Sequence, residues 1–98
     1  MNMSSKCRIN LSGIVVSKFN QRCIDNIMQK LINKSPSDSL LRLCIENGKS
    51  RINGSLSITS LSRKFESKQE GDNPLEVVKK LSKDLQFQIR VWKTERVF

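Results

Sequence analysis

An α+β fold of order β-α-β-β-β-α, a four-stranded sheet with two helices packed on one face, is predicted for this 98-residue chain. Three observations predict it: apolar and polar residues alternate over 7–12, a helical apolar period follows Ser17, and a helix start is marked at 73–76. A chain of this length builds one hydrophobic core, so residues 1–98 should form a single domain. We expect residues 1–5, which are polar, to be disordered.

The first half of the chain predicts a strand, a helix and a second strand. Residues 7–12 place Cys7, Ile9 and Leu11 on one face of a half-buried strand. Ser17 is a suitable helix cap. The apolar residues of the helix recur at helical offsets: Phe19, Cys23, Ile24, Ile27, Met28, Leu31 and Ile32. A turn around Pro36 ends the helix, and residues 40–46 are β-prone.

Two further strands and a hairpin are predicted after residue 46. Asn47-Gly48 favours a type I′ turn, because both residues accept positive φ. Strands are expected over about 51–59 and 62–69. Gly54 falls on the apolar side of the first of these, where it indicates a bulge or a close approach of a helix.

The last helix has the clearest start. Asn73 is suited to the N-cap, Pro74 to the first helical position, and Glu76 can reach back to the cap. One stripe of this helix should face the core: Leu75, Val78, Leu81, Leu85, Ile89 and Trp92. Both helices should then cover one face of an antiparallel sheet and leave the other face polar and open.

The composition favours a polyanion as the partner. The chain has 18 Lys and Arg against 9 Asp and Glu, a net charge of +9, and no His. Without His or a nucleophile or phosphate-loop motif, catalysis is not expected. Cys7, Cys23 and Cys44 have no zinc spacing, so we expect reduced, largely buried thiols and neither metal nor cofactor. No segment is apolar enough for a membrane span, so we expect a cytoplasmic protein.

Basic residues are predicted to gather on helix faces. In the last helix Lys79, Lys83, Gln86, Arg90 and Lys93 lie within about 80° of one another, with Lys80 to one side. The first helix has a polar face with a single acid, Asp25, and the fourth strand is basic. The remaining candidate RNA contacts are Lys18, Arg22, Lys30, Arg63, Lys64 and Lys68. Together with the net charge, this pattern predicts nucleic-acid binding.

The residues on the solvent-facing side of the predicted sheet limit which kind of nucleic acid the protein could bind. These are Arg8, Asn10, Arg42, Ser55 and Ser57, so bases are not expected to stack there as they do on RNA-recognition motifs. Helix-turn-helix and zinc-finger spacings are also missing from the sequence. Phosphate-led binding to a folded RNA fits best.

Two motifs resemble the ribosome hibernation promoting factor family, which includes the ribosome-associated inhibitor and the sigma-54 modulation proteins. They are Ile9-Asn10-Leu11-Ser12-Gly13 and the segment Phe65-Glu66-Ser67-Lys68-Gln69-Glu70-Gly71-Asp72-Asn73-Pro74-Leu75, which leads into the basic helix. The resemblance runs from about Cys7 to Arg96. The chain departs from the family pattern at Asp84, Phe87 and Val91, which stand where the family helix carries basic residues.

The resemblance implies a short-form factor of the stress response that binds the small ribosomal subunit through 16S rRNA. It would inhibit translation by occupying the channel for messenger and transfer RNA, and it would be a monomer off the ribosome. It also implies that Arg22 and Lys30 contact RNA.

Two alternatives stay open. The chain resembles in part the double-stranded RNA-binding domain, which would make it a general binder of structured RNA. It is otherwise a protein-interaction module that presents an open sheet edge or the apolar residues Phe87, Val91, Val97 and Phe98, which have no place in the predicted core.

Overall fold

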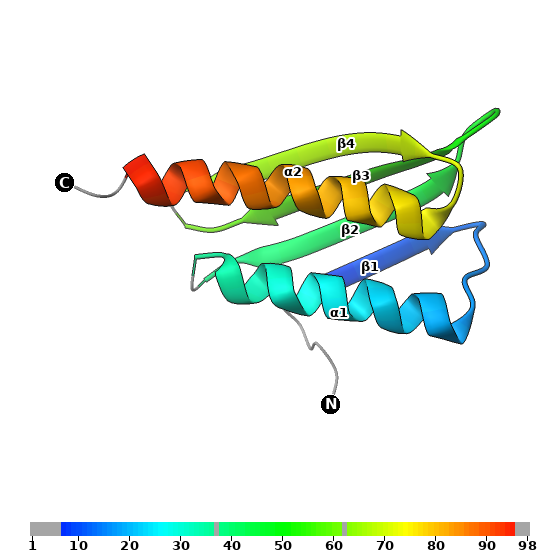
Figure 1. Ribbon diagram of the computed structural model, residues 1–98, viewed down its shortest axis with the longest axis horizontal. Helices are drawn as coiled ribbons and strands as arrows, with labels where there is room; N and C mark the ends of the chain where they lie inside the picture. The colour runs from blue at the N-terminus through cyan, green and yellow to red at the C-terminus, as the bar shows by residue number, and fades with distance from the viewer. Residues whose placement is uncertain (1–6, 37, 62, 96–98) are drawn as a thin grey trace.

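The computed structural model describes residues 7–36, 38–61 and 63–95, and it has the predicted element order. The expected disorder of residues 1–5 lies outside the described residues. The elements are β1 (Cys7–Ser12), α1 (Lys18–Lys34), β2 (Leu40–Asn47), β3 (Ile52–Thr59), β4 (Lys64–Gly71) and α2 (Pro74–Glu95). Both helices lie on the same face of the sheet and run in the same direction (Figure 1).

The sheet is mixed, so the expectation of an antiparallel sheet was wrong at one pair of strands. The strand order is β1-β2-β3-β4, and β1 runs parallel to β2 while the other two pairs are antiparallel. The cause is α1, which carries the chain back along the sheet so that β2 starts at the same end as β1. The register sets Ile9 beside Leu43 and Leu43 beside Leu56, which gives the helices a continuous apolar face.

The hairpin between β2 and β3 forms as predicted, but its turn is not type I′. Asn47 still pairs with Ile52, and the loop spans residues 48–51 with the Gly48 N–H donating to the Arg51 carbonyl at 2.7 Å. Among the described glycines only Gly13 has a positive φ, of 68°. The Asn47 side chain instead donates to the Gly13 carbonyl at 3.1 Å and ties the hairpin to the end of β1.

The core lies between the sheet and the two helices. In α2 every residue of the predicted stripe is buried except Leu75, which is half-buried. Trp92 packs edge-on against Phe65 of β4, with ring centroids 6.1 Å apart. Gly54 marks a close helix approach and not a bulge, because β3 keeps its register on both sides and an added Cβ would meet Val77 of α2.

Both helices start where the sequence predicts. The Ser17 hydroxyl accepts the Asn20 N–H at 3.1 Å, and the Asn73 side chain accepts the Glu76 N–H at 2.9 Å. Glu76 reaches back one residue further than a capping box requires, because its carboxylate accepts the N–H of Asp72 at 2.9 Å. This hydrogen bond is the main reason why the pKa of Glu76 is lowered; Lys80 and Arg51 act in the same direction, and desolvation opposes them.

The lowered pKa of Glu76 predicts a pH effect on stability. Glu76 stabilises the fold above its unfolded-state pKa of about 4.3, and that contribution is lost as the pH falls through the lower folded-state pKa. We therefore expect Glu76→Gln to lose less thermal stability than the unmodified protein between about pH 7 and pH 3. Thermal melts followed by circular dichroism measure this difference, with Glu46→Gln as a control on an exposed carboxylate of β2. Equal acid sensitivity in the Glu76→Gln variant and the unmodified protein would contradict the prediction.

Phe19 does not join the apolar face of α1 and is 73% exposed, whereas Ile24, Met28 and Leu31 are fully buried. The cause is helical geometry. Phe19 lies about 20° from the exposed Asn26 and Lys30 around the axis of α1, and about 120° or more from the three buried residues. It therefore belongs to the solvent side of α1.

The three cysteines are free thiols, but they are half-buried and not largely buried as expected. Cys44 alternates with Leu43 and Ile45 in β2, so it lies on the sheet face away from the helices. Burial and the nearby Asp25 carboxylate raise the pKa of the Cys7 thiol.

Candidate nucleic-acid interface

The cations of α2 lie on the flank of that helix that faces α1. Lys79, Lys83, Arg90 and Lys93 are all exposed and share one side of α2 with Gln86. The Gln86 side chain accepts a hydrogen bond from Lys34, the last residue of α1, at 3.4 Å. That contact shows that the basic flank borders the seam between the two helices.

Three of the four described helix carboxylates are held away from the basic flank. On α1 the Asp25 carboxylate accepts from Gln21 and lies near Cys7 of β1. On α2 the Glu76 carboxylate is bound at the junction with β4, and that of Glu95 pairs with Arg63 just before β4 at 3.3 Å. The fourth, Asp84, forms no ion pair among the described residues, and Lys18 lies on the same side of α1 as Asp25, so the charges of the helical layer are segregated in part.

Eight exposed cations of the helices form what we term the basic helical surface. They have in common that none forms an ion pair with a carboxylate of the described residues. Seven of them are predicted RNA contacts. The eight are Lys18, Arg22, Lys30, Lys34, Lys79, Lys83, Arg90 and Lys93.

Lys34 is the member of this surface that the sequence reasoning missed. We assigned it to the turn around Pro36, whereas α1 continues through Lys34 and Ser35 caps it. The available signal was the helical spacing from Lys30, four residues earlier, which places both ammonium groups on the same side of α1.

Three other candidates carry local contacts instead. The Lys80 ammonium donates to the Glu70 carbonyl of β4 at 2.8 Å and pairs with Glu76 at 3.6 Å. Lys64 pairs with Glu66 at 3.4 Å, and Arg63 pairs with Glu95. These cations lie on the β4 side of the molecule, away from the seam.

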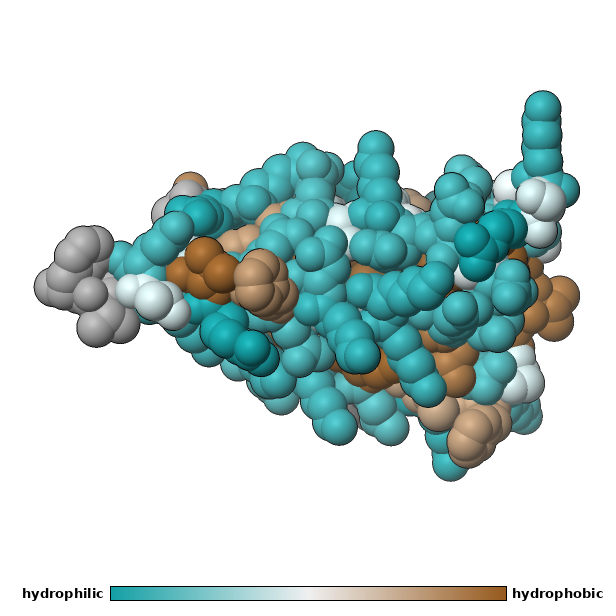
Figure 2. All heavy atoms as spheres, turned by 45° about the horizontal axis from the view of Figure 1, so that its top comes forward, coloured by the Kyte–Doolittle hydropathy of each residue, from teal (hydrophilic) through white to brown (hydrophobic). Residues whose placement is uncertain are grey.

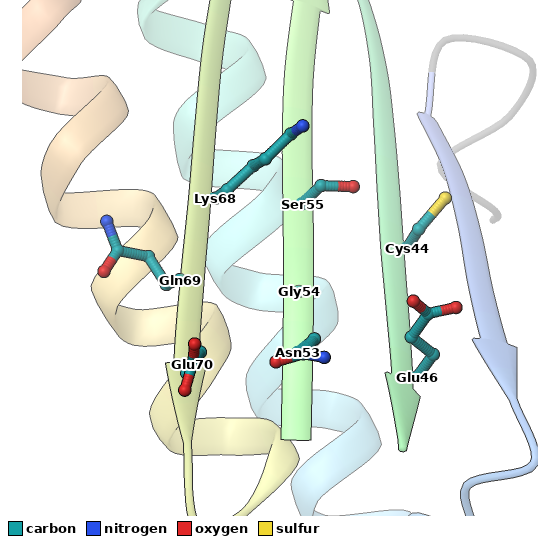
Figure 3. Close-up of a pocket in the computed structure, with 8 residues that line it drawn as sticks. All are labelled: Cys44, Glu46, Asn53, Gly54, Ser55, Lys68, Gln69 and Glu70. Atoms are coloured by element: carbon teal, nitrogen blue, oxygen red, sulfur yellow. The ribbon is translucent and has the colours of Figure 1, made fainter. Parts of the chain in front are cut away.

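Lys68 lies on the open face, by which we mean the face of the sheet away from the helices. Figure 3 shows its side chain reaching across β3 toward Ser55, in a hollow that also has Glu46 and Glu70 on its walls. The charges of the described strands on this face nearly balance: cations Arg8, Arg42, Lys64 and Lys68, carboxylates Glu46, Glu66 and Glu70. The open face is therefore a poor phosphate surface beside the helical one.

Neighbouring lysines on α2 have different surroundings, which predicts different effects of substitution. Lys79→Ala should leave stability unchanged and weaken RNA binding, because this ammonium has no partner among the described residues. Lys80→Ala should lower the free energy of unfolding by about 0.5–1 kcal/mol, because it removes a hydrogen bond to a strand carbonyl. Urea unfolding and RNA titration of both variants measure the two effects. If Lys79→Ala lowered stability and Lys80→Ala weakened RNA binding, the roles assigned to the two lysines would be wrong.

A small apolar patch interrupts the polar surface over α2. Phe87 and Val91 are 60% and 39% exposed and stand one turn apart, and Figure 2 shows the patch surrounded by hydrophilic side chains. Their predicted exposure is confirmed; Val97 and Phe98 lie outside the described residues. Phe87 is next to the basic flank on one side and to Asp84 on the other.

Other classes of site find little support in the described part of the chain. Residues 7–36, 38–61 and 63–95 contain no group of three or more Cys, Asp or Glu arranged to hold a metal ion. Over the same residues, neither helix is long and apolar enough to cross a bilayer.

The fold and the charges define an α+β domain with a mixed four-stranded sheet, a nearly neutral open face and a cationic helical layer. Two solved structures share this fold. A ribosomal subunit interface protein from Coxiella burnetii has a TM-score of 0.70 and 15% sequence identity, over 90% of this chain and 97% of that chain. The N-terminal domain of Protein Y from Thermus thermophilus has a TM-score of 0.72 and 5% identity, over 87% of this chain and 94% of that chain. No protein-family model and no curated protein sequence matches this chain.

Proposed function

We propose that this protein is a ribosome-binding factor that inhibits translation without catalysing a reaction. The basic helical surface would bind 16S rRNA of the small subunit in the cytoplasm, and the domain would occupy the channel for messenger and transfer RNA. The observation that carries the proposal is the basic helical surface, whose eight cations pair with no carboxylate among the described residues. The ribosomal subunit interface protein and Protein Y, which share the fold, support the choice of ribosome as the RNA.

The arrangement suits phosphates better than base edges. Ammonium and guanidinium groups donate to phosphate and sugar oxygens at many angles, so they fix position without reading sequence. Gln86 sits between the α2 cations, but its amide is already engaged, since it accepts from Lys34 and donates to Ser82. Lys79 and Lys93 are fourteen residues apart, which is about 21 Å along the helix axis and spans several nucleotides of a backbone.

Co-sedimentation with purified small subunits tests this function. We expect the protein to travel with small subunits at about 50 mM salt and to be released at about 200 mM. If six cations each engage one phosphate, the log-log slope of affinity against salt should be about −4 to −5. Failure to co-sediment at low salt would contradict the proposal.

Channel occupancy has its own test. If the domain fills the channel, saturating protein should prevent small subunits from binding a labelled messenger RNA and initiator transfer RNA, and should stop translation in a purified system. Co-sedimentation without this competition would place the protein elsewhere on the subunit.

The same preparation separates the alternatives. Equal affinity for small subunits and for any RNA duplex would indicate a general structured-RNA binder. Binding that survives ribonuclease treatment and high salt would indicate a protein partner, for which an open sheet edge or the Phe87 and Val91 patch offers a surface.

A further inference from the structure

Phe19 is an exposed aromatic ring at one end of a row of polar and cationic side chains on α1. Its ring is 73% exposed, and Val15 just before the helix is 98% exposed. Arg22, Asn26 and Lys30 follow Phe19 within about 80° when the helix is viewed along its axis. The row contains no acidic residue, because Asp25 lies on the β1 side of the helix, near Cys7.

The exposure of Phe19 follows from the regular geometry of α1 and does not require a distortion of the helix. Helix α1 begins normally at its Ser17 cap, and regular helix geometry then places Phe19 on the same exposed side as Asn26 and Lys30. No residue of the described chain forms a ring contact with Phe19. A large apolar ring therefore stands in water beside unpaired cations, and its burial by a ligand would be favourable.

The charges around the ring select the ligand that could cover it. An apolar protein side chain would bury the ring but would leave Lys18 and Arg22 unpaired at the edge of the contact. An RNA base brings a flat π-face together with the phosphates on either side of it, so it satisfies both the ring and the cations. Bases inside a duplex are stacked on their neighbours and only its end pairs expose a face, so an unpaired base is the better ligand for the ring.

We propose that Phe19 is a stacking platform for one unpaired RNA base, and that Arg22 and Lys30 bind the phosphates that flank it. The inference rests on the proposed function in that the ligand is RNA, and it adds the class of RNA: a loop, bulge or single strand next to a helix. The inference also places base stacking on the helical layer and not on the open face, where the described positions include no aromatic residue.

Phe87 provides a matched control, because it is an equally large and similarly exposed ring on the other helix. It differs in its neighbours: Asp84 lies three residues before it, and Val91 extends it into an apolar pair. We expect no stacking there.

The experiment measures the affinity of the full chain for two labelled RNA probes by fluorescence anisotropy. One probe is a hairpin with a single-stranded loop, and the other is a blunt-ended duplex of the same length. Phe19→Ala should weaken hairpin binding about tenfold and leave duplex binding unchanged. Phe19→Trp should keep full affinity, Phe19→Leu should resemble Phe19→Ala because it lacks a π-face, and Phe87→Ala should bind normally. The salt slope should be the same in all variants, because no phosphate contact is removed.

Three results would overturn the inference: hairpin affinity unchanged in Phe19→Ala, an equal loss on hairpin and duplex, or full affinity in Phe19→Leu. A fourth is a Phe19→Ala variant that loses binding to small subunits but not to RNA, which would indicate a protein partner. The probes contain no ribosome, so the outcome does not depend on whether the RNA that the protein binds is ribosomal. If the protein prefers the hairpin through Phe19 but does not co-sediment with small subunits, base stacking on Phe19 is supported and ribosome binding is contradicted.

Discussion

The double variant Lys83→Glu with Arg90→Glu should lose binding to small ribosomal subunits by about 100-fold at about 0.1 M salt. Both side chains are exposed on the flank of α2 that borders the seam, and neither has a carboxylate partner among the described residues. Each substitution removes a phosphate contact and also places a negative charge against the RNA backbone. Because no internal ion pair is broken, thermal stability should stay close to that of the unmodified protein.

The matched control is Arg42→Glu with Lys68→Glu on the open face. It changes the net charge by the same amount, so the nonspecific loss of attraction to RNA is equal in the two variants. We expect the control to retain most of the affinity and the full salt slope, whereas the α2 variant should have a slope smaller by about 1.5. Sedimentation at several salt concentrations gives both quantities. Equal losses in the two variants would show that net charge governs binding and that the basic helical surface has no special role.

Local chemistry explains why most of the fold was predictable. Residues close together in the sequence are enough to predict three features: the alternation in the strands, the Ser17 and Asn73 caps, and the apolar stripe of α2. The parallel pairing of β1 with β2 depends on where α1 returns the chain, although a strand-helix-strand unit normally gives this pairing. The turn after Asn47 was predicted wrongly, because Asn47 belongs to β2 and pairs with Ile52, so the loop spans residues 48–51; the Asn47 side chain donates to Gly13, thirty-four residues away.

The candidate site was less predictable, because it depends on contacts between elements. Helical spacing found seven of the eight cations on the basic helical surface. It placed Lys80 to one side of the other cations of α2 but could not show that the partner of Lys80 is a carbonyl of β4. The prediction that Phe19 joins the apolar face of α1 was wrong, although helical spacing alone places Phe19 with the exposed Asn26 and Lys30.

The second large effect concerns the contact that holds α2 against the sheet. Gly54→Ala should lower the free energy of unfolding by about 2–3 kcal/mol, which corresponds to roughly 10 °C or more in Tm for a domain of this size. A Cβ at this position would collide with Val77 and would lie 2.9 Å from Ile45 Cδ1 and 3.1 Å from Leu81 Cδ1. Val77, Ile45 and Leu81 are fully buried, so they have little room to move.

A double-mutant cycle with Val77→Ala shows whether this collision is the cause. Val77→Ala alone should destabilise the protein, because it leaves a cavity in the core. Combined with Gly54→Ala, the new methyl group fills part of that cavity, so the double variant should be more stable than the sum of the single effects by about 1 kcal/mol or more. Urea unfolding of the four proteins measures the coupling. Strictly additive losses would mean that Gly54→Ala acts through the strand backbone, and the close approach of α2 would then not be the reason why glycine stands at this position.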